Sequence, residues 1–101
     1  KNNKWNWITN KQLINSVVNC RNILQEHKID SEDRIAYKGS NSINWISWNL
    51  ATNSLGATWV PMYADQSISY SNFIIKDCNP KLLIQDENLE KIVTYKYYQM
   101  I

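Results

Sequence analysis

Short apolar segments alternate with stretches of helical periodicity along this chain. The apolar segments lie at residues 34–38, 57–62 and 81–85, and each has the length of a strand. The stretches between them, about 42–55 and 68–77, have the length and spacing of amphipathic helices. Strands that alternate with helices predict a parallel sheet that is covered on both faces. We therefore expect an α/β fold with a short parallel sheet.

A further helix is predicted ahead of the first strand, over about residues 10–27, because apolar residues recur there at helical spacing. Thr9 is a suitable N-cap, and Gln12 stands three positions later, as a capping box requires. The segment before this helix alternates tryptophans with polar residues. We therefore expect residues 1–9 to form an extended arm or a strand.

The stretch NLATNSLGATWVPMYADQS contains three residues that limit the backbone. Gly56 stands where the left-handed residue after a helix belongs. Pro61 has no N–H group, so its strand is expected at a sheet edge or where a ladder ends. Ser67 is expected to cap the next helix. That helix is predicted to bury three apolar residues, Tyr70, Phe73 and Ile74.

The helix over about 42–55, which Asn41 or Ser42 is expected to cap, is apolar on two sides. One side holds Ile43, Ile46 and Leu50, and the other holds Trp45, Trp48 and Leu55. An outer helix on a three-stranded sheet needs only one apolar side, so this pattern indicates burial on two sides. We infer that a further layer, which is missing from this chain, covers the helix and is supplied by another segment of the domain or by a partner subunit.

The last fifteen residues, 87–101, fit two kinds of structure. Leu89, Ile92, Val93 and Tyr97 recur at helical spacing, which favours a helical tail. The run TYKYYQMI also suits a strand, because it is rich in aromatic and β-branched residues. We expect the helical tail and keep the strand as the alternative.

Composition and charge exclude several classes of protein. The hydrophobic content of 44% argues against a disordered chain. The net charge is +2 and the lysines are scattered, so neither nucleic acid nor an anionic membrane is expected as a partner. No apolar run approaches about 18 residues, so we expect no transmembrane segment. Cys20 and Cys78 lack metal-binding spacing, and a reduced, intracellular setting is the simplest interpretation.

Few side chains suggest chemistry. The run KGSNS, residues 38–42, follows a strand and opens a helix, where a phosphate could meet helix N–H groups, but its single glycine favours a capped turn. Residues 63–67 follow a strand at its ligand-binding end, and we favour a plain connection over a contribution to a substrate channel. His27 has no nearby nucleophile, and the acidic run at 30–33 lacks calcium-loop spacing. We assign no catalytic, cofactor-binding or metal-ligating residue to this chain.

Five short motifs follow one another between residues 33 and 84. They are, in order, Asp33-Arg34-Ile35-Ala36; Asn41 with Asn44-Trp45; Leu50-Ala51 with Leu55-Gly56-Ala57; Val60-Pro61-Met62-Tyr63 with Ser67; and Pro80-Lys81-Leu82-Leu83-Ile84. This series resembles the N-terminal part of adenylate-forming (AMP-binding) enzymes, above all the long-chain fatty acid acyl-CoA synthetases. The resemblance extends over about residues 5–85. Its specificity lies in the order of the motifs rather than in any one of them.

The resemblance implies a partial N-terminal subdomain, with an α/β core over residues 10–86. It also implies that the complete enzyme activates a carboxylate, here a fatty acid, with ATP and magnesium as an acyl-adenylate and then transfers the acyl group to coenzyme A. The family's phosphate-binding loop, ATP-contacting aspartate, hinge and C-terminal lysine have no counterpart here. We therefore expect an N-terminal fragment that is inactive alone and that needs the remainder of the domain. The implied location is cytoplasmic, either free or membrane-peripheral.

The residues leave one alternative of a different class. The chain is then a stand-alone, non-catalytic α/β module that docks on a partner through a tryptophan-rich face. Whether the chain itself is an enzyme stays open at this point.

Overall fold

The computed structural model describes residues 9–40, 42–63, 65–86 and 95–99. The elements, in chain order, are α1 (Asn10–Glu26), β1 (Arg34–Gly39), α2 (Ile43–Ser54), β2 (Thr58–Tyr63), α3 (Ile68–Cys78), β3 (Leu82–Asp86) and β4 (Tyr95–Gln99). The predicted alternation of strands and helices is therefore confirmed. Residues 1–8, which were expected to form an arm or a strand, lie outside the described residues.

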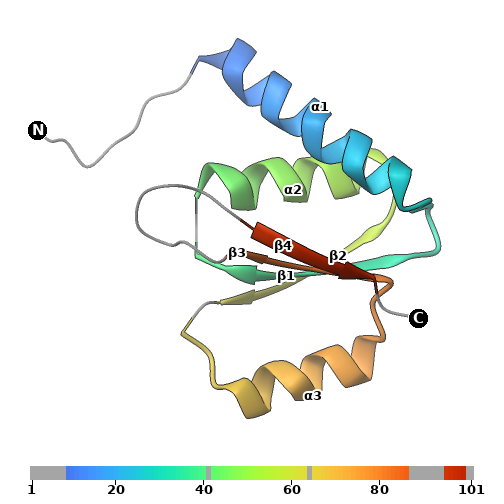
Figure 1. The fold of residues 1–101 in the computed structure, drawn as a ribbon, viewed down its shortest axis with the longest axis vertical. Helices are drawn as coiled ribbons and strands as arrows, with labels where there is room; N and C mark the ends of the chain where they lie inside the picture. The colour runs from blue at the N-terminus through green and yellow to red at the C-terminus, as the bar shows by residue number, and fades with distance from the viewer. Residues whose placement is uncertain (1–8, 41, 64, 87–94, 100–101) are drawn as a thin grey trace, which may run out of the picture.

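The four strands form one sheet in the order β2-β1-β3-β4. β1 pairs in parallel with β2 on one side and with β3 on the other. Figure 1 shows α2 on one face of the sheet with α1 stacked over it, and α3 on the opposite face. The predicted parallel sheet with both faces covered is confirmed. β2 lies at a sheet edge, which is the position predicted for the strand that contains Pro61.

The prediction of a helical tail is wrong for residues 95–99. They form β4, which pairs antiparallel with β3 and places Tyr97 opposite Ile84. Without β4, the N–H and C=O groups on that side of β3 would lack ladder partners, and a run rich in aromatic residues suits the pairing. The other residues of the expected helical stripe lie outside the described residues.

The helix ends form as local side-chain chemistry predicts. The Thr9 hydroxyl accepts the Gln12 N–H at 3.0 Å, and the Gln12 side chain accepts the Thr9 N–H at 2.9 Å, so the capping box is confirmed. The Ser42 hydroxyl accepts the Trp45 N–H at 3.2 Å, which identifies Ser42 as the cap of α2. Gly56 has φ = 74°, the left-handed conformation expected just after this helix.

The sheet separates two apolar clusters. The larger cluster lies on the α2 side and contains Cys20, Leu24, Ile29, Ile35, Tyr37, Trp48, Ala51, Ala57, Leu82 and Ile84. The smaller cluster lies on the α3 side and contains Ala36, Met62 and Leu83, with Val60, Ile74 and Ile75 packed against it. Most of the burial that stabilises the fold is therefore on the α1–α2 side of the sheet.

Helix α3 contacts the sheet through a different stripe from the one predicted. Tyr70 and Phe73 are 50% and 66% exposed, so the prediction that they are buried is wrong. Ser71 is buried instead, and Ile74 and Ile75 pack on the smaller core cluster. The predicted and the observed stripe both have helical spacing. The stripe that packs on the sheet is shifted by one residue toward the C-terminus from the predicted one.

Helix α2 is covered on one side by the sheet and on another by α1. Trp48 is fully buried, and the hydroxyls of Ser16 and Ser47 join α1 to α2 at 2.7 Å. Part of the cover of α2 therefore comes from α1 of this chain, whereas the sequence predicted a layer from outside it. Ile46 and Leu50 nevertheless remain 46% and 45% exposed.

Candidate functional site

The carboxyl ends of β1 and β2 meet at a point where the chain reverses its winding. After β1 the chain passes to α2 on one face of the sheet, and after β2 it passes to α3 on the other face (Figure 1). The two strands are adjacent and parallel, and their last paired residues are Gly39 and Tyr63. Ligands of open α/β sheets bind outside the carboxyl ends of the strands. The place where β1 ends at Gly39 and β2 ends at Tyr63, which we call the switch point because the chain leaves for opposite faces there, is therefore the candidate site.

The structure brings both loops considered from the sequence to this point. The first is the run KGSNS, in which the Ser42 hydroxyl already accepts an N–H group at the start of α2. Lys38 alternates along β1 with Tyr37, which lies in the core on the α2 side, so Lys38 lies on the other face of the sheet. The lysine is thus separated by the sheet from the N-terminus of α2, and the geometry favours a capped turn.

The second loop follows Tyr63 and is held by its own side chains. The Gln66 side chain accepts the Tyr63 N–H at 3.1 Å, and the Gln66 N–H donates to the Tyr63 carbonyl at 3.1 Å. The Ser67 hydroxyl accepts the Tyr70 N–H at 3.1 Å, which confirms Ser67 as the cap of α3. These contacts fix the geometry of the loop and give Gln66 and Ser67 structural roles.

An aromatic cluster, formed by Tyr37, Trp45, Trp59 and Tyr63, connects the core to the switch point. Tyr37 is fully buried and contacts Trp45 and Trp59 at centroid distances of 5.5 and 5.3 Å. Trp45 in turn stacks on Tyr63 at 5.4 Å with 17° between the ring planes. Tyr63 is 50% exposed, so the cluster ends at the site in a side chain that is half-exposed to solvent. Sequence reasoning missed this arrangement, whose only signal was the i, i+4 spacing of Trp59 and Tyr63 on one strand face.

The described residues contain no constellation for catalysis at this point. His27 contacts the Ile23 carbonyl through Nδ1 at 3.0 Å, at the end of α1. Cys20 is buried, and burial raises the pKa of its thiol to about 12, so it stays protonated near neutral pH. Among the described residues, no group of three or more His, Cys, Asp or Glu side chains could hold a metal ion. None of the described helices is long and apolar enough to cross a membrane.

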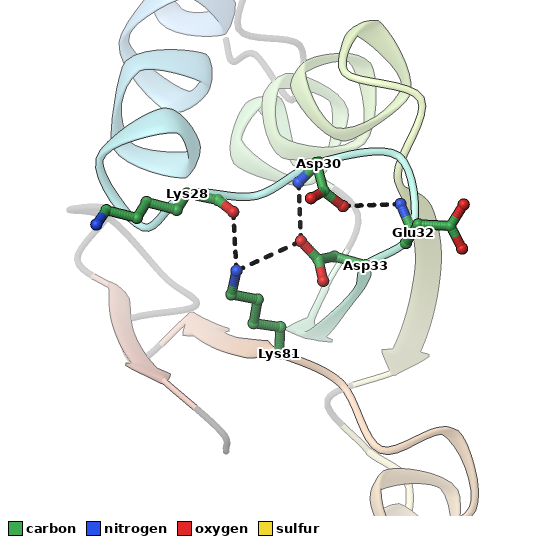
Figure 2. Close-up of polar contacts among 5 residues, drawn as sticks. All are labelled: Lys28, Asp30, Glu32, Asp33 and Lys81. Atoms are coloured by element: carbon green, nitrogen blue, oxygen red, sulfur yellow. Dashed lines mark hydrogen bonds and ion pairs between the residues drawn. The ribbon is translucent and has the colours of Figure 1, made fainter.

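The acidic run at 30–33 belongs to a set of contacts at the other end of the strands, beside the amino ends of β1 and β3. We call this set the Lys81 clasp (Figure 2). The Lys81 ammonium donates to the Lys28 carbonyl at 2.8 Å and pairs with the Asp33 carboxylate at 3.5 Å. Asp33 also accepts the Asp30 N–H at 2.8 Å, and Asp30 accepts the Glu32 N–H at 2.9 Å. The carboxylates of Asp30 and Asp33, two of the three in this run, therefore accept backbone N–H groups of the turn, which is a structural role.

With the geometry known, comparison with known proteins identifies the family. The sequence model of the AMP-binding enzymes matches residues 2–98. The chain belongs to the AMP-binding enzyme family. Long chain acyl-CoA synthetase 3 from Arabidopsis thaliana is 30% identical to this family member over 88 residues, which are 87% of this chain and 13% of that protein. The resemblance expected from the ordered motifs is thus confirmed.

Solved structures place the fold among the N-terminal domains of adenylate-forming enzymes. The crystal structure of CmiS6 matches 94% of this AMP-binding chain and 26% of its own, with a TM-score of 0.78 and 17% identity. The inhibitor-bound N-terminal domain of FACL13 from Mycobacterium tuberculosis matches 77% of this chain and 20% of its own, with a TM-score of 0.72 and 26% identity. The chain therefore corresponds to a small part of the proteins that it resembles.

Proposed function

We propose that this chain is the N-terminal structural part of an acyl-CoA synthetase that acts on a fatty acid. The proposed enzyme activates the carboxylate with ATP as an acyl-adenylate and transfers the acyl group to coenzyme A. The observation that carries the proposal is the 30% identity to a long chain acyl-CoA synthetase over 87% of this chain, within the match to the AMP-binding family. The carboxylate substrate, coenzyme A and an intracellular location belong to this proposal.

The described residues do not fit the sites for ATP and magnesium. The run KGSNS at the end of β1 contains one glycine, its lysine lies on the far face of the sheet from α2, and Ser42 caps the helix. The described residues also lack a carboxylate cluster for a metal ion. We therefore derive no step of the reaction from this chain. Its proposed role is to fold the first part of the domain and to supply the switch point between Gly39 and Tyr63 as a wall beside the substrates.

The size of the relatives supports a structural role. The aligned part is only 20% of the FACL13 N-terminal domain, so 80% of that domain lies outside it. By analogy, we propose that this chain needs the remainder of an adenylate-forming domain to act.

The alternative of a stand-alone module that docks through tryptophans has less support. Trp48 is fully buried, and Trp45 and Trp59 pack against the core cluster and against each other at 5.9 Å. Trp5 and Trp7 lie outside the described residues. The described part of the chain therefore presents no tryptophan-rich face to solvent.

A graft tests the proposed function. The 88-residue segment of Arabidopsis long chain acyl-CoA synthetase 3 that aligns with this chain is replaced by this chain. We expect the graft to catalyse exchange of pyrophosphate into ATP that depends on a long-chain fatty acid, while the isolated chain catalyses none. A graft with Trp48→Asp is the control, because burying a charge there should abolish folding. A folded but inactive graft, or exchange by the isolated chain, would refute the proposal.

A further inference from the structure

The hydroxyl group of Ser71 is a buried donor that the fold leaves without a partner. Ser71 lies in the first turn of α3 and is 2% exposed, and its Oγ forms no hydrogen bond. The carbonyl of Ser67, one turn earlier, accepts the Ser71 N–H at 3.0 Å but not the hydroxyl. Side chains of a helix tilt toward its N-terminus, so this hydroxyl is directed toward the start of α3. A buried polar group without a partner costs stability and needs an explanation.

The start of α3 offers further donors. The Tyr70 N–H donates to the Ser67 hydroxyl and the Ser71 N–H donates to the Ser67 carbonyl, whereas the N–H groups of Ile68 and Ser69 have no partner among the described residues. The first turn contains no acidic residue. Free N–H groups and the positive end of the helix dipole both favour an anion there. Every helix start shares these properties, so the side chains around this one decide whether it is a site.

Lys38 places a cation on the same face of the sheet. Side chains alternate between the two faces along β1, and Ala36 packs in the smaller core cluster on the α3 side. Arg34 also faces α3, because its Nε donates to the Cys78 carbonyl at the end of that helix. Lys38 follows the same alternation and therefore faces α3. It is partly buried, and its ammonium has neither a hydrogen bond nor an ion pair with any described residue.

Lys38 and Ser71 lie at the same level of the fold. Figure 1 shows α3 beginning beyond the carboxyl end of β2 and running back along the opposite face of the sheet from α2. From the contact between Arg34 and Cys78, Lys38 is four residues along β1, about 13 Å, and Ser71 is seven residues back along α3, about 10 Å. Gln85 on β3 is paired with Lys38 in the sheet register, so it lies on the same face, partly buried and without a hydrogen bond to any described residue.

We propose that these groups bind a phosphate group, either free or carried by a nucleotide. We call them the α3 donor set, which consists of the side chains of Lys38, Ser71 and Gln85 and the N–H groups of Ile68 and Ser69. Every member can donate a hydrogen bond, and Lys38 adds a positive charge. Donors that come from a helix and from two strands suit a tetrahedral ligand with several oxygens better than a planar carboxylate with two. Asp65, in the loop before α3, is exposed and forms no ion pair with Lys38.

The first test is a titration of the isolated chain with inorganic phosphate at constant ionic strength, followed by nuclear magnetic resonance of the backbone amides. The amides of Ile68 and Ser69 should shift most, because their N–H groups meet the ligand. Lys38→Met keeps the unbranched stem and should weaken phosphate binding at least about tenfold. Lys76→Met is the matched control, because it removes the same charge from an exposed position in the last turn of α3, and it should change binding less than about twofold.

Ser71→Ala distinguishes a hydroxyl that binds a ligand from one that stabilises the fold. Without phosphate, this variant should unfold at the same temperature as the wild type or at a higher one, because it loses an unpaired buried donor and gains a better helix former. It should nevertheless bind phosphate about threefold to tenfold more weakly. A lower unfolding temperature without phosphate, or unchanged phosphate binding, would overturn the assignment of this hydroxyl to a ligand.

Further titrations with AMP, adenosine and acetate identify the class and source of the ligand. AMP that binds more tightly than phosphate, while adenosine does not bind, would support the phosphate site and assign it to a nucleotide. Phosphate that binds at least as tightly as AMP would support the site and assign it to the free ion. Acetate that binds as tightly as phosphate, adenosine that binds as AMP does, or wild-type and Lys38→Met chains that bind equally would overturn the proposal.

The proposal goes beyond the proposed function and does not depend on it, because phosphate binding is measured without exchange activity. Where the isolated chain does not fold, equilibrium dialysis of phosphate against the graft in Arabidopsis long chain acyl-CoA synthetase 3 replaces the titration. In the graft, Lys38→Met should lower phosphate binding and Lys76→Met should not, and equal effects of the two would overturn the proposal. A folded graft without exchange activity that still shows this difference would refute the proposed function and support the α3 donor set.

Discussion

The Lys81 clasp should contribute measurably to stability, and Lys81→Met isolates that contribution. Methionine keeps most of the unbranched stem but removes the ammonium group, which donates to the Lys28 carbonyl and pairs with Asp33. These contacts tie the turn before β1 to the residue before β3, so they hold the amino ends of two parallel strands together. We expect the variant to fold with the same topology and lower stability.

The magnitude follows from the two contacts. A hydrogen bond from a charged donor contributes about 1.5–3 kcal/mol, and the low end applies because the Lys81 side chain is 31% exposed. The ion pair at 3.5 Å adds roughly 0.5 kcal/mol, since the Asp33 side chain is 19% exposed and the pair is partly screened. The free energy of unfolding should therefore fall by about 2 kcal/mol. With a urea slope of about 2 kcal/mol per molar, the midpoint should fall by about 1 M.

The assay is urea unfolding followed by far-ultraviolet circular dichroism at low and high sodium chloride. The matched control is Lys28→Met, because Figure 2 shows the Lys28 side chain directed away from the clasp while its carbonyl is the acceptor. This control should change stability by less than about 0.5 kcal/mol. High salt should reduce only the ion-pair part of the difference. A Lys81→Met chain as stable as the wild type, or equal losses in both variants, would show that the clasp does not stabilise the fold.

Three further outcomes are expected. Burial raises the pKa of the Cys20 thiol from 9.0 to about 12, so the unfolded chain loses this proton at a lower pH than the folded chain does. The free energy of unfolding should therefore fall between pH 9 and pH 12, by up to about 1.4 kcal/mol per pH unit. Urea titrations should show that Cys20→Ala removes this pH dependence more fully than Cys78→Ala does. Gly56→Ala should cost about 1–2 kcal/mol in a thermal unfolding scan because φ is 74° there, and an unchanged midpoint would mean that the helix end relaxes. Trp48→Ala should cost about 3–5 kcal/mol by urea unfolding, because the side chain is fully buried, and a smaller loss would show that the core collapses around the cavity.

Features determined by local chemistry were predictable from the sequence. The capping box of Thr9 and Gln12, the caps at Ser42 and Ser67, and the left-handed Gly56 each depend on residues within one or two turns of each other. Their hydrogen bonds and dihedral angles are therefore available to the chain before any tertiary contact forms. The order of the elements from α1 to β3 followed from local signals of this kind.

Features that depend on distant contacts were not predictable in the same way. Helix α3 has two apolar stripes, and only packing on the sheet chooses the one that buries Ser71 and exposes Phe73. Residues 95–99 form β4 because β3 offers a pairing edge, and the local patterns, which suited both a helix and a strand, did not decide between them. The two loops of the candidate site were noticed separately, but their convergence required the order β2-β1-β3 and hence the whole sheet. The stacking of Trp45 on Tyr63 joins α2 to β2 and has the same origin.

The aromatic cluster gives the switch point its own optical label. Trp45 and Trp59 are close enough for their excited states to couple, and Trp45 lies in stacking contact with Tyr63, the half-exposed ring at the candidate site. A molecule or chain segment that covers Tyr63 must change the polarity around these indoles. Events at the carboxyl ends of β1 and β2 can therefore be followed by intrinsic emission, without attaching a dye to the chain.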